Sequence, residues 1–322
     1  MAALILLMIA LNYVYQYFFL EADLQEHSNI IRNVRNAVKG SDVIYFGESS
    51  NSNVNANDTD SRHISTMISD YFPEVHFGVI EQAAYHAEMY KVLMPHIPSN
   101  SNVKTIIVTM NLRSFNAGWI YSDLETSLQK SMVLLRDRPA LLNRFLLSFK
   151  GYEIKSMEER HQQIYSKWER DSLRFPYPFE YKTVKEWDKA VAWGRWKMID
   201  STWSKKKIEL ATHYIKAYAF QIDTLTNPRI ADFDEIVRIA EKRNWNLVFN
   251  LLAENVEKAN ILLGDDILFL LHSNRDLLVN RYQRKGAVVV DNLESVPDKS
   301  FSDRNGLQSI MTRSGGPLLQ RM

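Results

Sequence analysis

Five short runs of apolar residues, several of them rich in β-branched side chains, recur along the chain, and stretches with helical periodicity separate them. Alternating strands and helices are typical of right-handed βαβ units, which build a parallel sheet covered by helices on both faces. We therefore expect an α/β fold with three layers, αβα, and a mostly parallel sheet. The expected strands are residues 43–47, 75–80, 104–110, 246–252 and 287–290. A further apolar run, 267–271, fits a strand or a helix.

Composition narrows the class of protein. The chain has 322 residues, of which 46% are apolar, enough for a large core. Its 39 basic and 38 acidic residues give a net charge of +1, which argues against general binding of nucleic acid. Cysteine is absent, which excludes disulfides, thiolate metal sites and a cysteine nucleophile. We expect no metal, no cofactor and no nucleic-acid partner.

The first 20 residues are almost wholly apolar, and roughly 17–25 such residues span a bilayer. Aromatic residues gather at the end of this stretch, and no small-residue cleavage site follows it. We expect an uncleaved transmembrane or signal-anchor helix over 1–20 and a helical connector over 21–41. The basic residues lie after the stretch and none precedes it, which does not favour an exported domain. The alternative is an amphipathic helix buried against the domain.

The α/β domain is expected over residues 42–305, with a helical insertion at about 121–223. Its part from 150 to 206 holds five of the seven tryptophans and many basic residues. Such a segment could stack on sugars or nucleobases, or lie on a lipid surface. Alternatively, its aromatic side chains simply bury against the main domain, as their helix-like spacing favours. These tryptophans are Trp168, Trp187, Trp193, Trp196 and Trp203.

The first expected strand ends at Gly47 and is followed by Glu48, Ser49 and Ser50. Chemistry in open α/β sheets collects beyond the carboxyl ends of strands, so Ser49 is either an exposed nucleophile or an ordinary helix cap. Asn111 follows the third strand and should reach the same edge of the sheet. This convergence favours the nucleophile.

Four other polar residues near this edge allow two interpretations each. Arg113 would orient a carboxylate or a sugar hydroxyl, or form an ion pair with Glu48. His86, at the start of a helix, would contact substrate or pack in the core. Asp60 and His63 have the D-x-x-H spacing of an acid–base pair, but Asp60 also suits the N-cap of the next helix, which is the interpretation we favour.

These motifs resemble the SGNH, or GDSL-like, hydrolase superfamily. Gly47-Glu48-Ser49 stands where that family has G-D-S, and Asn111 matches its block-three asparagine. The resemblance covers roughly 42–120 and 245–305, and it implies a flavodoxin-like sheet. It also implies that Ser49 is the nucleophile and that the Asn111 amide and the Ser49 backbone N–H stabilise the oxyanion. Glu48 replaces the usual aspartate, and Ala83 stands in for the family's block-two glycine.

The family takes its base from a terminal D-x-x-H, for which Asp303 is the matching acid, but no histidine follows His272. One added nucleotide before residue 306 allows a reading frame with histidine in place of Ile310. We therefore expect residues 306–322 to be an atypical tail, a frameshift product. Loss of the base would impair turnover strongly.

With its SGNH-like motifs and its apolar first 20 residues, the chain resembles two groups of envelope proteins. One group works with membrane-bound O-acyltransferases, and the other is the D-alanine transfer proteins. The implied function is a serine acyl esterase or acyltransferase acting on an O-acylated envelope glycan. Such a protein would be anchored in a bacterial membrane with its globular domain outside the cytoplasm, and its partners would be the acyl donor or glycan and a membrane-bound O-acyltransferase. The alternative is an anchored binding or assembly protein that keeps the fold without catalysis.

Overall fold

The computed structural model describes residues 2–52, 60–152, 154–173, 181–193 and 204–301. At its centre lies a sheet of five strands, and every neighbouring pair is parallel. The strand order β2-β1-β3-β4-β5 is that of flavodoxin-like sheets. The α/β class and the five expected strands are confirmed, with ends shifted by at most two residues. The strands are β1 (Val43–Gly47), β2 (Phe77–Glu81), β3 (Thr105–Met110), β4 (Asn246–Leu251) and β5 (Val288–Asp291).

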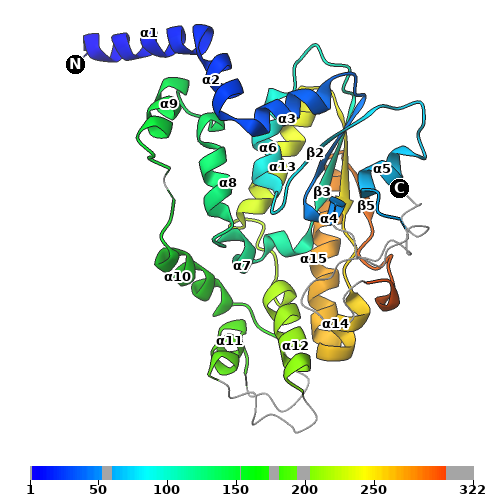
Figure 1. Cartoon of the computed structure of the whole chain (residues 1–322). Coiled ribbons are helices and arrows are strands. Elements are labelled where there is room, and N and C mark those ends of the chain that lie inside the picture. Colours follow the sequence, from blue (N-terminus) through cyan, green and yellow to red (C-terminus); the bar gives the residue numbers. More distant parts are fainter. Residues whose placement is uncertain (1, 53–59, 153, 174–180, 194–203, 302–322) are drawn as a thin grey trace.

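One face of the sheet carries the main core. Alternate side chains such as Phe46, Val108 and Phe249 are fully buried there, because successive strand residues point to opposite faces. Figure 1 shows α3, α6 and α13 on this side of the sheet. The main covering helices are α3 (Asn29–Val38), α6 (Ala87–Leu93), α13 (Pro228–Lys242) and α15 (Asp265–Arg284).

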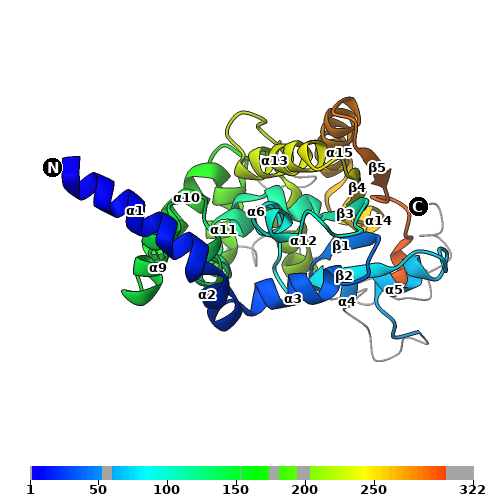
Figure 2. The ribbon, with the colours of Figure 1, turned by 90° about the horizontal axis from the view of Figure 1, so that it is seen from above.

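The opposite face is covered by a smaller cluster. Val43, Tyr45 and Ile107 pack there against α5 (Ile64–Ser69), which Figure 2 shows on the far side of the strands from α6. The cap expected for α5 is wrong: the N-cap position is taken by His63, and Asp60 instead accepts a 3.0 Å hydrogen bond from the Arg62 backbone N–H. The side chain of Arg62 also pairs with Asp60, so this local ion pair wins over capping.

The long connection from β3 to α13 is helical, as expected for an insertion. The connection is made of several short helices, and Pro139 stands at the N-cap of one of them. Trp168 and Trp187 are buried, as the packing interpretation requires, whereas Trp193 is 64% exposed. Trp196 and Trp203 lie outside the described residues. The helices are α7 (Ala117–Ile120), α8 (Glu125–Ser131), α9 (Ala140–Ser148), α10 (Met157–Trp168), α11 (Val184–Ala192) and α12 (Lys205–Tyr218), with the 3₁₀ turn η3 (Val133–Leu135).

The chain returns to the sheet through α13. After β4, α14 (Val256–Leu263) and α15 lead to β5, and the ambiguous apolar run 267–271 belongs to α15. Short 3₁₀ turns lie at Met94–His96 (η1), Leu112–Phe115 (η2) and Asp298–Ser300 (η5). The expected tail, residues 306–322, lies outside the described residues.

At the other end of the chain, α1 (Ala2–Phe18) projects from the body of the molecule and α2 (Leu20–His27) turns back toward α3 (Figure 1). No single helix in the described part of the chain is long and apolar enough to cross a membrane, but α1 and α2, bent by 61°, meet that test together. The buried-helix alternative is wrong, since only Tyr15 of α1 is buried. The backbone N–H of Leu141 in α9 donates to the side-chain oxygen of Asn12 in α1 at 3.0 Å, so a hydrogen bond links α1 to α9.

Candidate functional site

The site lies at the carboxyl ends of β1 and β3, where the strand order reverses. From β1 the chain crosses to the edge strand β2, and from β3 it crosses the other way to β4. Such a switch point opens a crevice at which ligands bind in open α/β sheets. Glu48 and Ser49 follow β1, and Asn111 follows β3. The predicted residues therefore do converge on one edge of the sheet.

Asn111 is held on both sides of its amide. Its side-chain nitrogen donates to Glu48 Oε1 at 2.7 Å, and its side-chain oxygen accepts from the Arg113 backbone N–H at 3.0 Å, which caps η2. Glu48 and Asn111 thus form a direct bridge between the two strand ends. An amide nitrogen carries two N–H groups, so one remains for another acceptor.

Ser49 begins the short helix α4 (Ser49–Ser52) and is half-buried. The Asn51 backbone N–H donates to the Glu48 carbonyl at 3.0 Å, so the chain turns sharply from β1 into the helix. Among the residues that the structure describes, the Ser49 hydroxyl forms no hydrogen bond, and the buried Ser50 hydroxyl has none either. The serine lies at the predicted place, but nothing in the described chain holds its hydroxyl.

Ala83, the stand-in for the family's block-two glycine and so the expected third oxyanion donor, is exposed in the turn after β2. The turn is closed by a 3.2 Å hydrogen bond from the Tyr85 backbone N–H to the Gln82 carbonyl. Its third residue, Ala84, has a φ of +64°, a left-handed conformation that favours glycine. The glycine-type geometry therefore falls on Ala84, one residue after the predicted position.

A small pocket opens beside the Glu48 and Asn111 bridge. Its volume is about 30 Å³, enough for a water molecule. Buried aromatic side chains form much of its wall, and burial raises the pKa of Tyr85 to about 12. His86, at the N-cap position of α6, is buried in this wall. His86 therefore packs in the core, and it also lines the pocket.

Arg113 and Glu254 form a buried pair next to this pocket. Their closest side-chain atoms, Arg113 Nε and Glu254 Oε1, are 3.6 Å apart, and Glu254 is only 3% exposed. Burial raises the pKa of the Glu254 carboxyl, while the Arg113 charge opposes the shift. The Arg113 guanidinium also lies over the Trp119 ring, 5.8 Å from its centroid. Arg113 thus forms an ion pair, as one of the two interpretations predicted, but its partner is Glu254 and not Glu48.

Glu254 is a site residue that the sequence analysis missed. It stands three residues beyond the end of β4 at Leu251, much as Arg113 stands three residues beyond the end of β3. A polar residue soon after each parallel strand was the available signal. It was hidden because the apolar run of β4 continues through Leu252 and Ala253, so that Glu254 reads as the start of the next helix.

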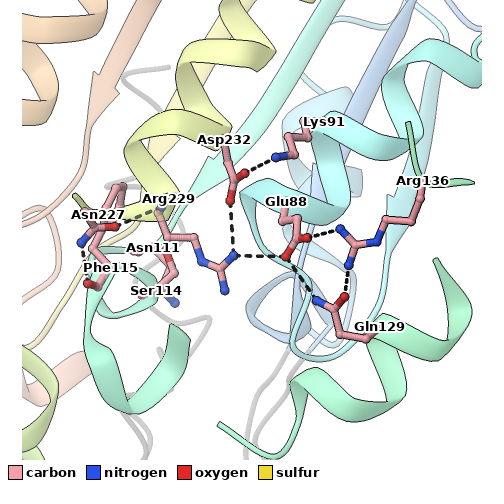
Figure 3. A network of polar contacts seen from close by, with 10 residues as sticks. All are labelled: Glu88, Lys91, Asn111, Ser114, Phe115, Gln129, Arg136, Asn227, Arg229 and Asp232. Atoms are coloured by element: carbon pink, nitrogen blue, oxygen red, sulfur yellow. Dashed lines mark hydrogen bonds and ion pairs between the residues drawn. The ribbon is translucent and has the colours of Figure 1, made fainter. Parts of the chain in front are cut away.

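A network of charged side chains includes Arg229, one of the residues that line the pocket (Figure 3). Arg229 of α13 lies 3.4 Å from Asp232 and 3.8 Å from Glu88 of α6, and Arg136 lies 2.7 Å from the same Glu88. Lys91 pairs with the other oxygen of Asp232. Arg229 and Asp232 are buried, and the ion pairs of the network link α6 to α13.

The same helix α13 fixes the turn after β3. The Asn227 side chain donates to the Phe115 carbonyl at 2.9 Å and accepts from the Arg229 backbone N–H at 3.0 Å (Figure 3). The Ser114 hydroxyl donates to the Asn111 carbonyl at 2.7 Å. The segment that carries Asn111 and Arg113 is therefore rigid, as a preorganised site requires.

On the other face of the sheet, the end of β2 holds a histidine. His63 Nδ1 lies 3.0 Å from Oε1 of Glu81, the residue paired in register with Gly47. Asn51 of α4 bonds to Glu81 and, at 3.0 Å, to the Ser65 hydroxyl. His63 thus has a carboxylate partner, which is Glu81 and not Asp60.

Asp303, the matching acid of the family's terminal motif, lies outside the described residues. No group of three or more metal-binding side chains occurs within the described ranges. Comparison of the sequence with protein-family models gave no match, and neither did a search of curated proteins.

Proposed function

We propose that this protein is a serine acyl esterase or acyltransferase with an SGNH-like site. The observation that carries the proposal is the arrangement at the switch point, where an unbonded Ser49 hydroxyl follows β1 and the Asn111 amide is fixed by Glu48 after β3. A hydroxyl nucleophile and fixed amide donors are what acyl transfer needs.

In the proposed reaction, the Ser49 oxygen attacks the ester carbonyl, and its proton passes to a base. The free N–H of the Asn111 amide and the Ser49 backbone N–H stabilise the oxyanion, with a third donor from the turn at Ala83 and Ala84. When the intermediate collapses, the ester C–O bond breaks, the leaving alcohol takes the proton from the base, and Ser49 holds the acyl group as an ester. Water or a sugar hydroxyl then gives its proton to the base and attacks this ester, and the acyl group leaves Ser49, which recovers its proton. The resemblance assigns the base to a histidine oriented by Asp303, which the shifted reading frame would restore at position 310, and turnover is strongly impaired without it.

The proposed setting is the outer side of a bacterial membrane, with an O-acylated envelope glycan as substrate and a membrane-bound O-acyltransferase as partner. Its support is the apolar surface of α1, where Leu6 and Phe18 are 66% and 67% exposed. Exposed apolar surface on this scale marks a lipid or protein contact.

A non-catalytic anchored binding protein is the competing function. Two observations favour it: one N–H of the Asn111 amide is already bonded to Glu48, and the pocket beside it admits only a water molecule. Under this function Ser49 is a polar residue at a helix start.

Labelling with a fluorophosphonate probe separates the two functions in a repaired protein, in which the shifted reading frame replaces residues 306–322 and places histidine at position 310. We expect the probe to modify the repaired protein and its Ser50→Ala control at equal rates, and Ser49→Ala in the same background to lose the label completely. Hydrolysis of p-nitrophenyl acetate should fall in parallel, by about 10³-fold or more. Equal labelling of the repaired protein and its Ser49→Ala variant, or no labelling of either, would favour the binding protein.

A further inference from the structure

A second hollow lies beside the strand-end pocket, in the helical insertion. It is an open cleft of about 590 Å³ between α7, α10, α11 and α12. The indole of Trp119 lines both the cleft and the strand-end pocket, so it forms the partition between them. Arg113 lies over this ring, and Trp119 is 37% exposed. The cleft thus adjoins the proposed site through one aromatic side chain.

Two of the residues that line the cleft each carry a buried polar atom with no hydrogen-bond partner in the described part of the chain. Trp168 is 6% exposed, and its Nε1–H forms no hydrogen bond within the described chain. Nε2 of the half-buried His213 forms no hydrogen bond there either. Buried polar groups are nearly always paired, so each such exception among the described residues has an unused hydrogen-bonding capacity that a water or a ligand hydroxyl could fill. Thr212, which also lines the cleft, is already satisfied: its hydroxyl donates to the Ile208 carbonyl at 2.7 Å and accepts from Trp187 Nε1 at 3.0 Å.

The charges around the cleft cancel one another. The Lys216 ammonium lies 2.7 Å from Asp188 and 4.8 Å from the centre of the Trp168 ring, and Glu209 lies 3.8 Å from Lys205. Burial and the nearby Arg113 charge lower the pKa of His213 to about 4, so its ring is neutral at pH 7. The described residues that line the cleft therefore offer no net charge to attract a phosphate or a carboxylate.

We propose that this cleft binds a neutral sugar residue of the substrate, with Trp119 as the stacking surface and Trp168 and His213 as hydrogen-bonding partners of its hydroxyls. A hydroxyl both donates and accepts, so it matches the Trp168 N–H donor and either tautomer of the His213 ring. The apolar lining with a few unpaired polar atoms is typical of small-ligand sites. This inference rests on the proposed function, because it places the sugar of the O-acylated glycan next to the site of acyl transfer.

The test is titration of the full-length protein, in its Ser49→Ala form to prevent turnover, with acetylated xylo-oligosaccharides and with xylohexaose, cellohexaose and chitohexaose. Calorimetry should show saturable binding of at least one neutral sugar and none of the anionic control, a galacturonate hexamer. Trp119→Ala and His213→Ala should each weaken binding by about 10-fold or more. Trp193→Ala, which changes an exposed tryptophan outside the cleft, should not, and His213→Gln should retain part of the affinity.

The outcomes separate this inference from the proposed function. Binding that is lost in Trp119→Ala, in a protein whose Ser49 is not labelled by fluorophosphonate, supports the cleft and overturns the catalysis. Labelling of Ser49 together with no saturable binding of any of these neutral sugars overturns the cleft. Binding that Trp119→Ala and His213→Ala leave unchanged overturns it as well, and circular dichroism of each variant verifies that the fold is retained.

Discussion

The buried pair of Arg113 and Glu254 illustrates how a single residue near the site contributes to stability. Removing one partner of a buried ion pair leaves the other charge without compensation, which costs about 3–5 kcal/mol. We expect Arg113→Met to lower the free energy of unfolding by that amount in urea titrations. The matched control is Arg238→Met, whose partner Glu235 lies on the surface and where the loss should stay within about 1 kcal/mol. Equal losses in the two variants would mean that Glu254 is not held by Arg113.

The pKa of Glu254 predicts a dependence of stability on pH. Burial raises it above its ordinary value of 4.5, so between that value and the folded-state pKa the folded protein binds more protons than the unfolded chain. Stability from this group is therefore fully present below about pH 4.5 and is lost as the pH rises through the folded-state pKa. Glu254→Gln cannot ionise, so it should not lose this stability as the pH rises. We therefore expect the free energy of unfolding of Glu254→Gln, relative to wild type, to increase with pH over this window in urea titrations at several pH values. Parallel curves for the two proteins would contradict the prediction.

At the scale of the element, the packing of α3 on β2 depends on a glycine. A Cβ atom added to Gly78 would lie 1.9 Å from the backbone carbonyl oxygen of Ala37, which is no flexible side chain. We expect Gly78→Ala to force α3 away from the sheet and to cost about 1–3 kcal/mol or more in denaturant unfolding. In the control, Gly151→Ala, the nearest atom to the new Cβ would be the tip of the Leu146 side chain at 3.0 Å, with backbone atoms no closer than 3.8 Å, and a smaller cost is expected. If Gly78→Ala proves as stable as wild type, α3 can move away from the sheet at no cost.

The elements also show what the sequence could and could not predict. All five strands were predictable, because buried parallel strands are short apolar runs between helical stretches. The run 267–271 was not assignable, since a short apolar run has the same pattern in a strand and in a buried helix. The N-cap at Asp60 failed because its neighbour Arg62 offers the carboxylate a charged partner.

The site was predictable in part for the same kind of reason. Glu48, Ser49 and Asn111 come together because parallel strands end at one edge, which the order of elements already implies. The partner of Arg113 was not predictable from the sequence, because Glu254 lies 141 positions away and only the tertiary fold brings the two side chains together. The pairing of His63 with Glu81 depends likewise on how α5 docks on the sheet.

At the scale of the whole molecule, the exposed helix α1 and the absence of cysteine permit a direct test of the proposed location. Lys189 of α11 is exposed, so Lys189→Cys creates a single thiol on the globular part of the chain. If α1 anchors the protein with that part outside the cytoplasm, a membrane-impermeant maleimide should label this thiol in bacterial cells whose cytoplasmic membrane is intact and whose outer envelope has been permeabilised. The cysteine-free wild type gives the background. Labelling that appears only after lysis would place the domain inside, away from any envelope glycan, and would leave the acyl-transfer site to be explained by a different substrate.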